Sequence, residues 1–187
     1  MNIISSPSPN YDERDGYKPE AIVIHCTDGY WPGDFNYLRD ISSQVSSHFV
    51  IAPSGLVYQL VDAAKRAWHA GRVEHPSVPL KRDGLGAIIN PNFYTIGIEV
   101  SLKPPTPMTA LQSSSLRDLV TELCQKYNIP QDRAHIWGHR EIYSVKTCPS
   151  TINVDALVKS LATVSVPTPV ENRESIKQDI IKLLSKL

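Results

Sequence analysis

The sequence predicts an α/β fold in which helices cover a central mixed β-sheet, and three observations support this prediction. Apolar runs typical of buried strands occur at 21–25, 48–61 and 95–101. A pattern of helical period follows over 109–127. A chain of 187 residues with 41% hydrophobic and 20% charged residues also has the size and composition of one globular domain with a real core.

The first segment is expected to hold an irregular arm and one buried strand. Residues 1–20 combine prolines and glycines with polar side chains and should form an irregular N-terminal arm. The run from Ala21 to His25 is apolar until its last residue. This is typical of a buried strand that presents a polar side chain at its edge.

A helix and a hairpin are expected next. After a loop at 28–33, Asp34 can cap a short helix to about Gln44, with one apolar face made of Phe35, Leu38 and Ile41. The apolar segments 48–52 and 56–61 predict a hairpin, because Gly55 between them can adopt positive φ.

The second half of the chain continues the sheet and covers it. Residues 72–94 show no hydrophobic periodicity and are expected to form a long surface loop. This loop is expected to form one wall of a substrate groove. At 95–101 the side chains alternate, so Glu99 shares a face with Thr95, Gly97 and Ser101, opposite the face of Ile96, Ile98 and Val100.

Two helices and a tail complete the prediction. Thr109 and Gln112 form a capping box for a helix to Tyr127, with a buried stripe at Leu116, Leu119, Val120, Leu123 and Tyr127. Residues 135–139 return to the sheet, and a closing helix follows from Asn153 to about residue 163. We therefore expect a domain at 21–163, followed at 164–187 by a linker and an amphipathic helix that docks onto the domain.

Charge and composition narrow the class of partner. Nineteen basic residues balance nineteen acidic ones, which gives no support to nucleic-acid binding. Residues 1–20 show no positive n-region followed by an apolar h-region, so we expect no signal peptide, and no apolar run approaches the length of a membrane span. We expect a chain made in the cytoplasm without insertion into a membrane. Three cysteines form an odd set that fits reduced thiols.

A candidate metal centre combines His139, Cys148 and the strand-end His25. Imidazole and thiolate are ligands that zinc prefers, and a catalytic zinc needs three protein ligands. The spacing matches no structural zinc finger, and a lone His or Cys is more often a packed or solvent-facing side chain than a ligand, so spacing alone does not require a metal.

Four segments in order, AIVIHCTDG, VSSHFVIAPSGLVYQLVDAAKRAWHAG, TIGIEVS and WGHREIYSVKTCPS, resemble the type 2 family of zinc-dependent N-acetylmuramoyl-L-alanine amidases. That family includes small phage amidase-lysozymes, anhydro-muropeptide amidases and peptidoglycan recognition proteins. The resemblance covers about residues 21–150. It implies the peptidoglycan-recognition-protein-like amidase fold and a Zn²⁺ ion held by His25, His139 and Cys148.

The resemblance also implies roles for the other matched residues. Glu99 falls on the family's catalytic glutamate, and Lys146 is expected to stabilise the oxyanion. Trp68 and His69 of the WHAG stretch are candidate substrate contacts. His48 is a third candidate, although a buried structural role explains it at least as well. Where some relatives carry a catalytic tyrosine, this chain has Ser47, which favours Glu99 as the base.

The implied substrate is the amide between N-acetylmuramic acid and L-alanine in peptidoglycan or its soluble fragments. An endolysin or autolysin would act on the cell wall after release, whereas a recycling enzyme would act on cytoplasmic muropeptides.

Two rival classes remain: a non-catalytic peptidoglycan-binding receptor of the same fold, and a cysteine hydrolase using Cys148 or Cys26. Receptors of the family typically lose the cysteine ligand, whereas this chain has Cys148. The activity of a cysteine hydrolase would persist in the presence of a chelator, whereas that of a zinc amidase would not.

Overall fold

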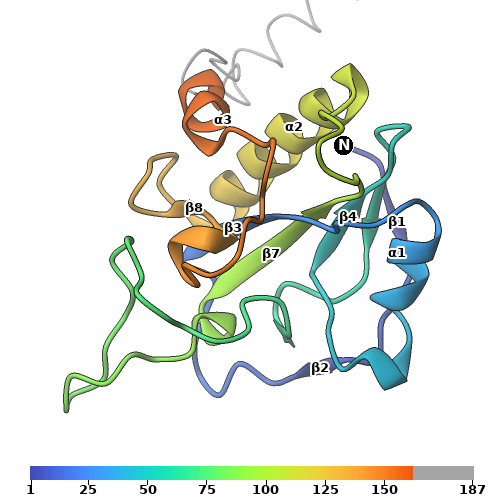
Figure 1. The fold of residues 1–187 in the computed structure, drawn as a ribbon. Helices are drawn as coiled ribbons and strands as arrows, with labels where there is room; N and C mark the ends of the chain where they lie inside the picture. The colour runs from blue at the N-terminus through green and yellow to red at the C-terminus, as the bar shows by residue number, and fades with distance from the viewer. Residues whose placement is uncertain (162–187) are drawn as a thin grey trace, which may run out of the picture.

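The computed structural model describes residues 1–161, which are built around a mixed six-stranded sheet (Figure 1). The strands lie in the order β1-β5-β4-β7-β3-β8, and only the β4–β5 pair of this sheet is antiparallel. Their bounds are β1 Ile3–Ser5, β3 Ala21–Cys26, β4 Phe49–Ile51, β5 Val57–Gln59, β7 Thr95–Val100 and β8 Ile136–Gly138. The mixed sheet, the hairpin and the strand ending near His25 are therefore confirmed.

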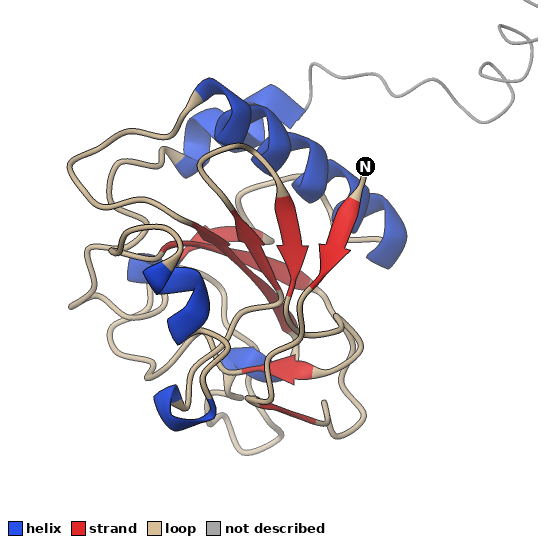
Figure 2. Ribbon diagram, turned by 90° about the vertical axis from the view of Figure 1, so that its right-hand side faces the viewer, coloured by secondary structure: helices blue, strands red, loops and turns tan. Residues whose placement is uncertain are grey.

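Two helices cover one face of this sheet, α2 (Ala110–Tyr127) and α3 (Val154–Leu161) (Figure 2). Helix α2 begins at the predicted capping box, in which Thr109 Oγ1 accepts from the Gln112 N–H and Gln112 Oε1 accepts from the Thr109 N–H, both at 3.0 Å. Its buried stripe packs on the alternate β7 side chains Ile96, Ile98 and Val100. The opposite face of β7 is left for polar groups, as the alternation predicts.

The predicted helix from Asp34 to Gln44 is wrong. The structure has a five-residue helix, α1 (Gly33–Tyr37), and a separate 3-10 turn at Ile41–Ser43. Asp34 lies inside α1 instead of capping it, and its carboxylate accepts hydrogen bonds from Thr27 and Ser101 at 2.6 Å. Ile41 is 71% exposed, so it does not share a buried face with Phe35 and Leu38.

The expectation of an irregular N-terminal arm is also wrong. Strand β1 pairs in parallel with β5, and β2 (Tyr11–Asp12) pairs with β6 (Arg66–Ala67) in a second small sheet. Arg14 is only 3% exposed. Its guanidinium donates hydrogen bonds to the main-chain oxygens of Ala63, Asn92, Phe93 and Thr95. Residues 1–20 are thus part of the packed domain.

The segment 72–94 is a surface excursion with isolated bridges at Glu74–Tyr143 and Arg82–Ile88, and it ends in a 3-10 turn at Pro91–Phe93. A further 3-10 turn, His139–Glu141, follows β8 directly. Among residues 1–161, no helix has the length and apolar character needed to cross a membrane. The predicted linker and amphipathic helix at 164–187 lie outside the described residues.

Candidate active site and metal centre

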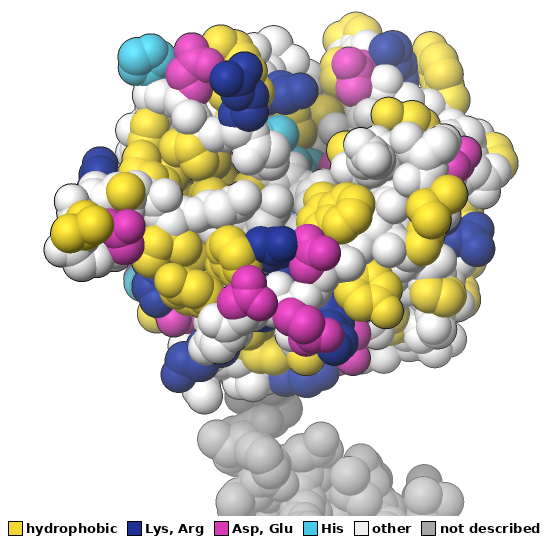
Figure 3. All heavy atoms as spheres, turned by 90° about the horizontal axis from the view of Figure 1, so that it is seen from below, with side chains coloured by type: hydrophobic (Ala, Val, Ile, Leu, Met, Phe, Trp, Pro, Cys, Tyr) yellow, Lys and Arg dark blue, Asp and Glu magenta, His cyan; other side chains and the backbone are white. Residues whose placement is uncertain are grey.

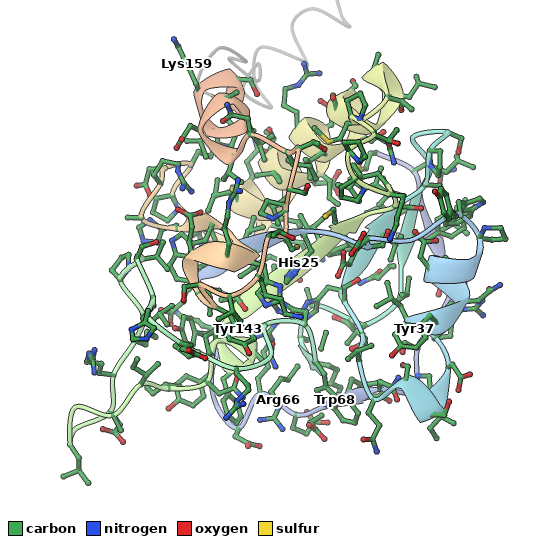
Figure 4. All side chains as sticks on the ribbon, viewed as in Figure 1. His25, Tyr37, Arg66, Trp68, Tyr143 and Lys159 are labelled. Carbon is green, nitrogen blue, oxygen red and sulfur yellow. The ribbon has the colours of Figure 1, made fainter. Side chains whose placement is uncertain are left out.

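The candidate site lies at the carboxyl ends of three neighbouring parallel strands. His25 near the end of β3 is in register with Glu99 of β7, and His139 comes directly after β8. Carboxyl ends of parallel strands meet at one edge of a sheet, which is where α/β folds commonly bind ligands. Figure 4 shows His25 near the middle of the molecule. Strand topology thus brings together side chains more than one hundred residues apart.

Cys148 joins this cluster through the turn after His139. The main-chain N–H of Arg140 donates to the Cys148 carbonyl at 2.8 Å, which folds the segment back onto the strand ends. One ligand atom from each of His25, His139 and Cys148 lies within 4.8 Å of the other two. Two imidazoles and one thiol at this separation can hold a metal ion after a small contraction, since zinc bonds to N and S are about 2.0–2.3 Å long.

Each of the two histidines has its Nε2 already engaged by a buried partner. His139 Nε2 lies 3.0 Å from the carbonyl oxygen of Ala70, which can only accept, so Nε2 carries the proton and Nδ1 keeps its lone pair. His25 Nε2 lies 3.1 Å from His69 Nδ1. Burial, above all, lowers the pKa of His139 to about 4 and holds the pKa of His25 well below its usual value. Neutral imidazoles with one free nitrogen are the form that a metal ligand requires.

Glu99 faces the same cluster and has an unused acceptor. Its Oε1 lies 4.0 Å from His25 Nδ1, and its buried Oε2 has no hydrogen-bond partner among residues 1–161. Burial raises the pKa of Glu99 to about 8, with smaller contributions from Cys26 and Asp34. An unpaired buried carboxylate oxygen costs free energy, so this atom fits a site that takes a proton, water or cation.

Lys146 supplies positive charge at the rim of the cluster. Its side chain is exposed and lines the cleft, with Nζ 5.9 Å from the ring centre of Tyr143. Its charge helps to lower the pKa of His25 and of His139. A cation in this place favours an anion forming in the cleft.

A cleft of about 700 Å³ opens onto these groups. Seen from below in Figure 3, histidine atoms show in a hollow of the surface. Its walls include Tyr37, Trp68, Arg72 and Tyr143. Trp68 is held by a hydrogen bond of 2.7 Å from its Nε1 to Asp12 of β2.

His48 and His69 lie in different surroundings. His48 is fully buried and does not line the cleft; its Nδ1 accepts from the Gly97 N–H at 2.9 Å, and its Nε2 lies 3.1 Å from the Lys65 carbonyl. The interpretation of His48 as a substrate contact is therefore wrong, and the structural alternative holds. His69 does line the cleft, although it is only 8% exposed.

Sequence reasoning missed Asp34 as a neighbour of the site, and it missed the main-chain contacts of Cys26. Asp34 bonds to Thr27 and Ser101, the residues directly after β3 and β7, and so ties the two strand ends together. A hydroxyl residue directly after each of two adjacent strands was the available signal. Cys26 provides main-chain contacts to Cys148, for which the sequence offers no signal.

Comparison with known proteins identifies the family. Residues 15–151, most of the chain, match the family described as N-acetylmuramoyl-L-alanine amidase. The chain belongs to the N-acetylmuramoyl-L-alanine amidase family. The expected fold and family are both confirmed.

Curated relatives of this amidase family member carry amidase names. It is 31% identical over 93 residues to N-acetylmuramoyl-L-alanine amidase A of Achromobacter lyticus, a match that covers 49% of this chain and 42% of that protein. It is 28% identical over 156 residues to 1,6-anhydro-N-acetylmuramyl-L-alanine amidase AmpD of Salmonella typhimurium strain LT2, which covers 73% of this chain and 76% of AmpD. The family and these names support amidase function.

Solved structures of the amidase family share the fold. A selenomethionine derivative of AmpD matches with a TM-score of 0.68 and 25% identity, over 85% of this chain and 93% of that one. A mutant endolysin from Bacillus subtilis matches with a TM-score of 0.65 and 24% identity, over 86% and 99% of the two chains.

Proposed function

We propose that this chain hydrolyses the amide between N-acetylmuramic acid and L-alanine, using a zinc ion held by His25, His139 and Cys148. The observation that carries the proposal is the convergence of these three groups with Glu99 in one cleft, in a chain of this amidase family. When bound, zinc supplies Lewis acidity and lowers the pKa of water towards ~7.

Glu99 is the proposed general base and acid. Its carboxylate takes a proton from the attacking water and delivers it to the nitrogen that leaves as the amino group of L-alanine. A pKa raised to about 8 by burial supports this role, because proton transfer in both directions is most efficient when the pKa lies near the working pH. The partnerless Oε2 leaves one oxygen free to face water.

Lys146 is the proposed oxyanion stabiliser. The carbonyl oxygen of the scissile amide gains negative charge as water adds to its carbon, and a fixed ammonium lowers the energy of that state. Its position at the rim of the cleft, two residues before Cys148, supports this role. Lys146 therefore acts on the transition state more than on the bound substrate.

Trp68 and Tyr37 offer aromatic surface along the cleft for sugar or peptide groups of peptidoglycan or a muropeptide. Relatives named AmpD and endolysin leave two settings, soluble muropeptides in the cytoplasm or the cell wall after release of the enzyme. The same bond is cut in both.

Mass spectrometry of the products tests the proposal. The protein is incubated with purified peptidoglycan and, separately, with soluble anhydro-muropeptides, with and without a chelator. Free L-alanine amino ends that appear only without chelator are expected, and the preferred substrate assigns the setting. Binding without cleavage by zinc-loaded protein would favour the receptor alternative, and cleavage that survives metal removal would favour a cysteine hydrolase.

A further inference from the structure

Buried hydrogen bonds link His25 to the main chain of the turn before β7. The Thr95 Oγ1 lies 2.7 Å from the Pro91 carbonyl oxygen and 3.2 Å from His69 Nε2. His69 Nδ1 in turn lies 3.1 Å from His25 Nε2. All three side chains are buried, with Thr95 fully enclosed. Water therefore offers the Thr95 hydroxyl no alternative partner.

The direction of each hydrogen bond follows from the first one. A carbonyl only accepts, so the single hydroxyl proton of Thr95 is donated to Pro91, and Thr95 Oγ1 must accept from His69 Nε2–H. Neutral His69 then has a bare Nδ1, which accepts from His25 Nε2–H. The lone pair of His25 is thereby placed on Nδ1, the nitrogen facing Glu99.

The directions also agree with the burial of the two rings. His25 is 2% exposed and His69 is 8% exposed. A ring nitrogen faces a ring nitrogen between them, so one of the two must donate and the other must accept. With one proton per ring, reversing any one hydrogen bond would bring two protons or two lone pairs face to face.

The position of the His69 ring is also fixed by its neighbours. The N–H groups of His69 and Ala70 both donate to Asn92 Oδ1, at 3.2 and 2.8 Å. The ring lies against Gly97 so closely that a Cβ added there would be 2.4 Å from His69 Cγ. Thr95, Gly97 and Glu99 lie on one face of β7. Thr95 accepts the hydrogen bond from His69, Gly97 leaves room for the His69 ring, and Glu99 faces His25.

We propose that His69 is a positioning residue that fixes His25 in the tautomer offering Nδ1 to the metal, and that Thr95 acts on His25 through it. The inference rests on the proposed metal site, and it replaces the interpretation of His69 as a substrate contact. Partners behind a ligating histidine typically contribute about 10–100-fold to metal affinity. A single hydroxyl in β7 thus controls the tautomers of two imidazoles.

The test compares Thr95→Val with Thr95→Ser in the full chain. Valine keeps the shape but removes the acceptor, so His69 shifts its proton to Nδ1 and forces the His25 proton onto its own Nδ1. Nitrogen-15 NMR of the metal-free protein should show this exchange for Thr95→Val, whereas Thr95→Ser keeps the wild-type tautomers. Zinc affinity, measured by competition with a chromophoric chelator, should fall about 10–100-fold for Thr95→Val and stay within about twofold for Thr95→Ser.

Gly97→Ala provides a second variant, because its methyl group must displace the His69 ring and should weaken zinc binding in the same direction. Unchanged His25 tautomer and zinc affinity in folded Thr95→Val would overturn the proposal, and so would equal losses in valine and serine variants. A substrate-contact role would raise KM in Thr95→Val at saturating zinc, where we expect KM to be unchanged. Wild-type protein that shows these tautomers but binds no zinc would contradict the proposed function and leave the hydrogen-bond assignment standing.

Discussion

The main chain of Cys26 makes two contacts with the sulfur of Cys148, an N–H that lies 3.2 Å from Sγ and a carbonyl oxygen at 3.7 Å. The carbonyl can accept from the thiol, and the N–H can donate to the thiolate. Both protonation states of Cys148 therefore have a partner on the same residue. This suits a sulfur that exchanges a proton for a metal ion.

Cys148→Ala should abolish tight zinc binding, because two imidazoles remain where three ligands are needed. Cys148→Asp should keep weaker binding, since a carboxylate oxygen is also a zinc ligand. Elemental analysis after gel filtration measures the metal content. Cys124→Ala removes a buried thiol of α2 outside the site and should retain about one zinc per chain. Full zinc content in folded Cys148→Ala would exclude this sulfur as a ligand.

Glu99→Gln should keep its zinc and lose about 10²–10⁴-fold in turnover, because an amide cannot take the proton from water. Steady-state kinetics with soluble muropeptide, together with metal analysis, checks both parts. The control is Glu122→Gln, an exposed residue whose carboxylate pairs with the N-terminal amino group. Turnover of Glu99→Gln close to that of the control would assign the base to another group.

Lys146→Ala should lower kcat about 10²-fold and change KM little, since the ammonium acts on charge that develops after binding. Lys126→Ala is a matched control: this lysine of α2 also lies over a tyrosine ring, 5.3 Å from the centre of Tyr127, but away from the cleft. A rise in KM with kcat unchanged would instead make Lys146 a residue that binds substrate.

Arg14→Met should destabilise the protein by more than about 3 kcal/mol, because it leaves buried carbonyl oxygens of Ala63, Asn92, Phe93 and Thr95 without donors. Urea unfolding measures the loss. Arg117→Met, on the exposed side of α2, should change stability by less than about 0.5 kcal/mol. Equal stability of the two variants would mean that residues 1–20 contribute little to the domain.

Asp12 should contribute to stability in a pH-dependent way. The hydrogen bond from Arg66, and then that from Trp68, lowers the pKa of Asp12 below its usual value. Since the folded pKa is the lower one, the contribution is present above the unfolded value near ~3.9 and is lost as pH falls through the folded value. Melting temperatures of wild type and Asp12→Asn should therefore differ at pH 7 and converge towards pH 2. A constant difference would contradict this linkage.

Local sequence patterns predicted much of the fold, but they did not predict the contacts between segments that are distant in the sequence. The capping box at Thr109 and Gln112, the hairpin around Gly55 and the alternation that isolates Glu99 each depend on neighbouring residues. Strand β1 and buried Arg14 depend on partners about fifty to eighty residues away, which no local pattern encodes.

The candidate site divides in the same way. The family's motifs located His25, Glu99, His139, Lys146 and Cys148, which the structure brings to one cleft. They did not separate the roles of His48 and His69, since both are histidines next to apolar segments. The difference arises from packing: His48 accepts a hydrogen bond from the main-chain N–H of Gly97 in β7, whereas the His69 ring lies against Gly97 and beside His25.

His25 and Cys148, the first and last of the proposed ligands in the sequence, are 123 positions apart and meet only after the parallel strands have assembled. An ion bound by both has no counterpart in the unfolded chain, so its binding free energy adds directly to the stability of the fold. Each tenfold rise in free zinc above the dissociation constant should then add about 1.4 kcal/mol to the free energy of unfolding. The melting temperature of the protein therefore reports the occupancy of its metal site.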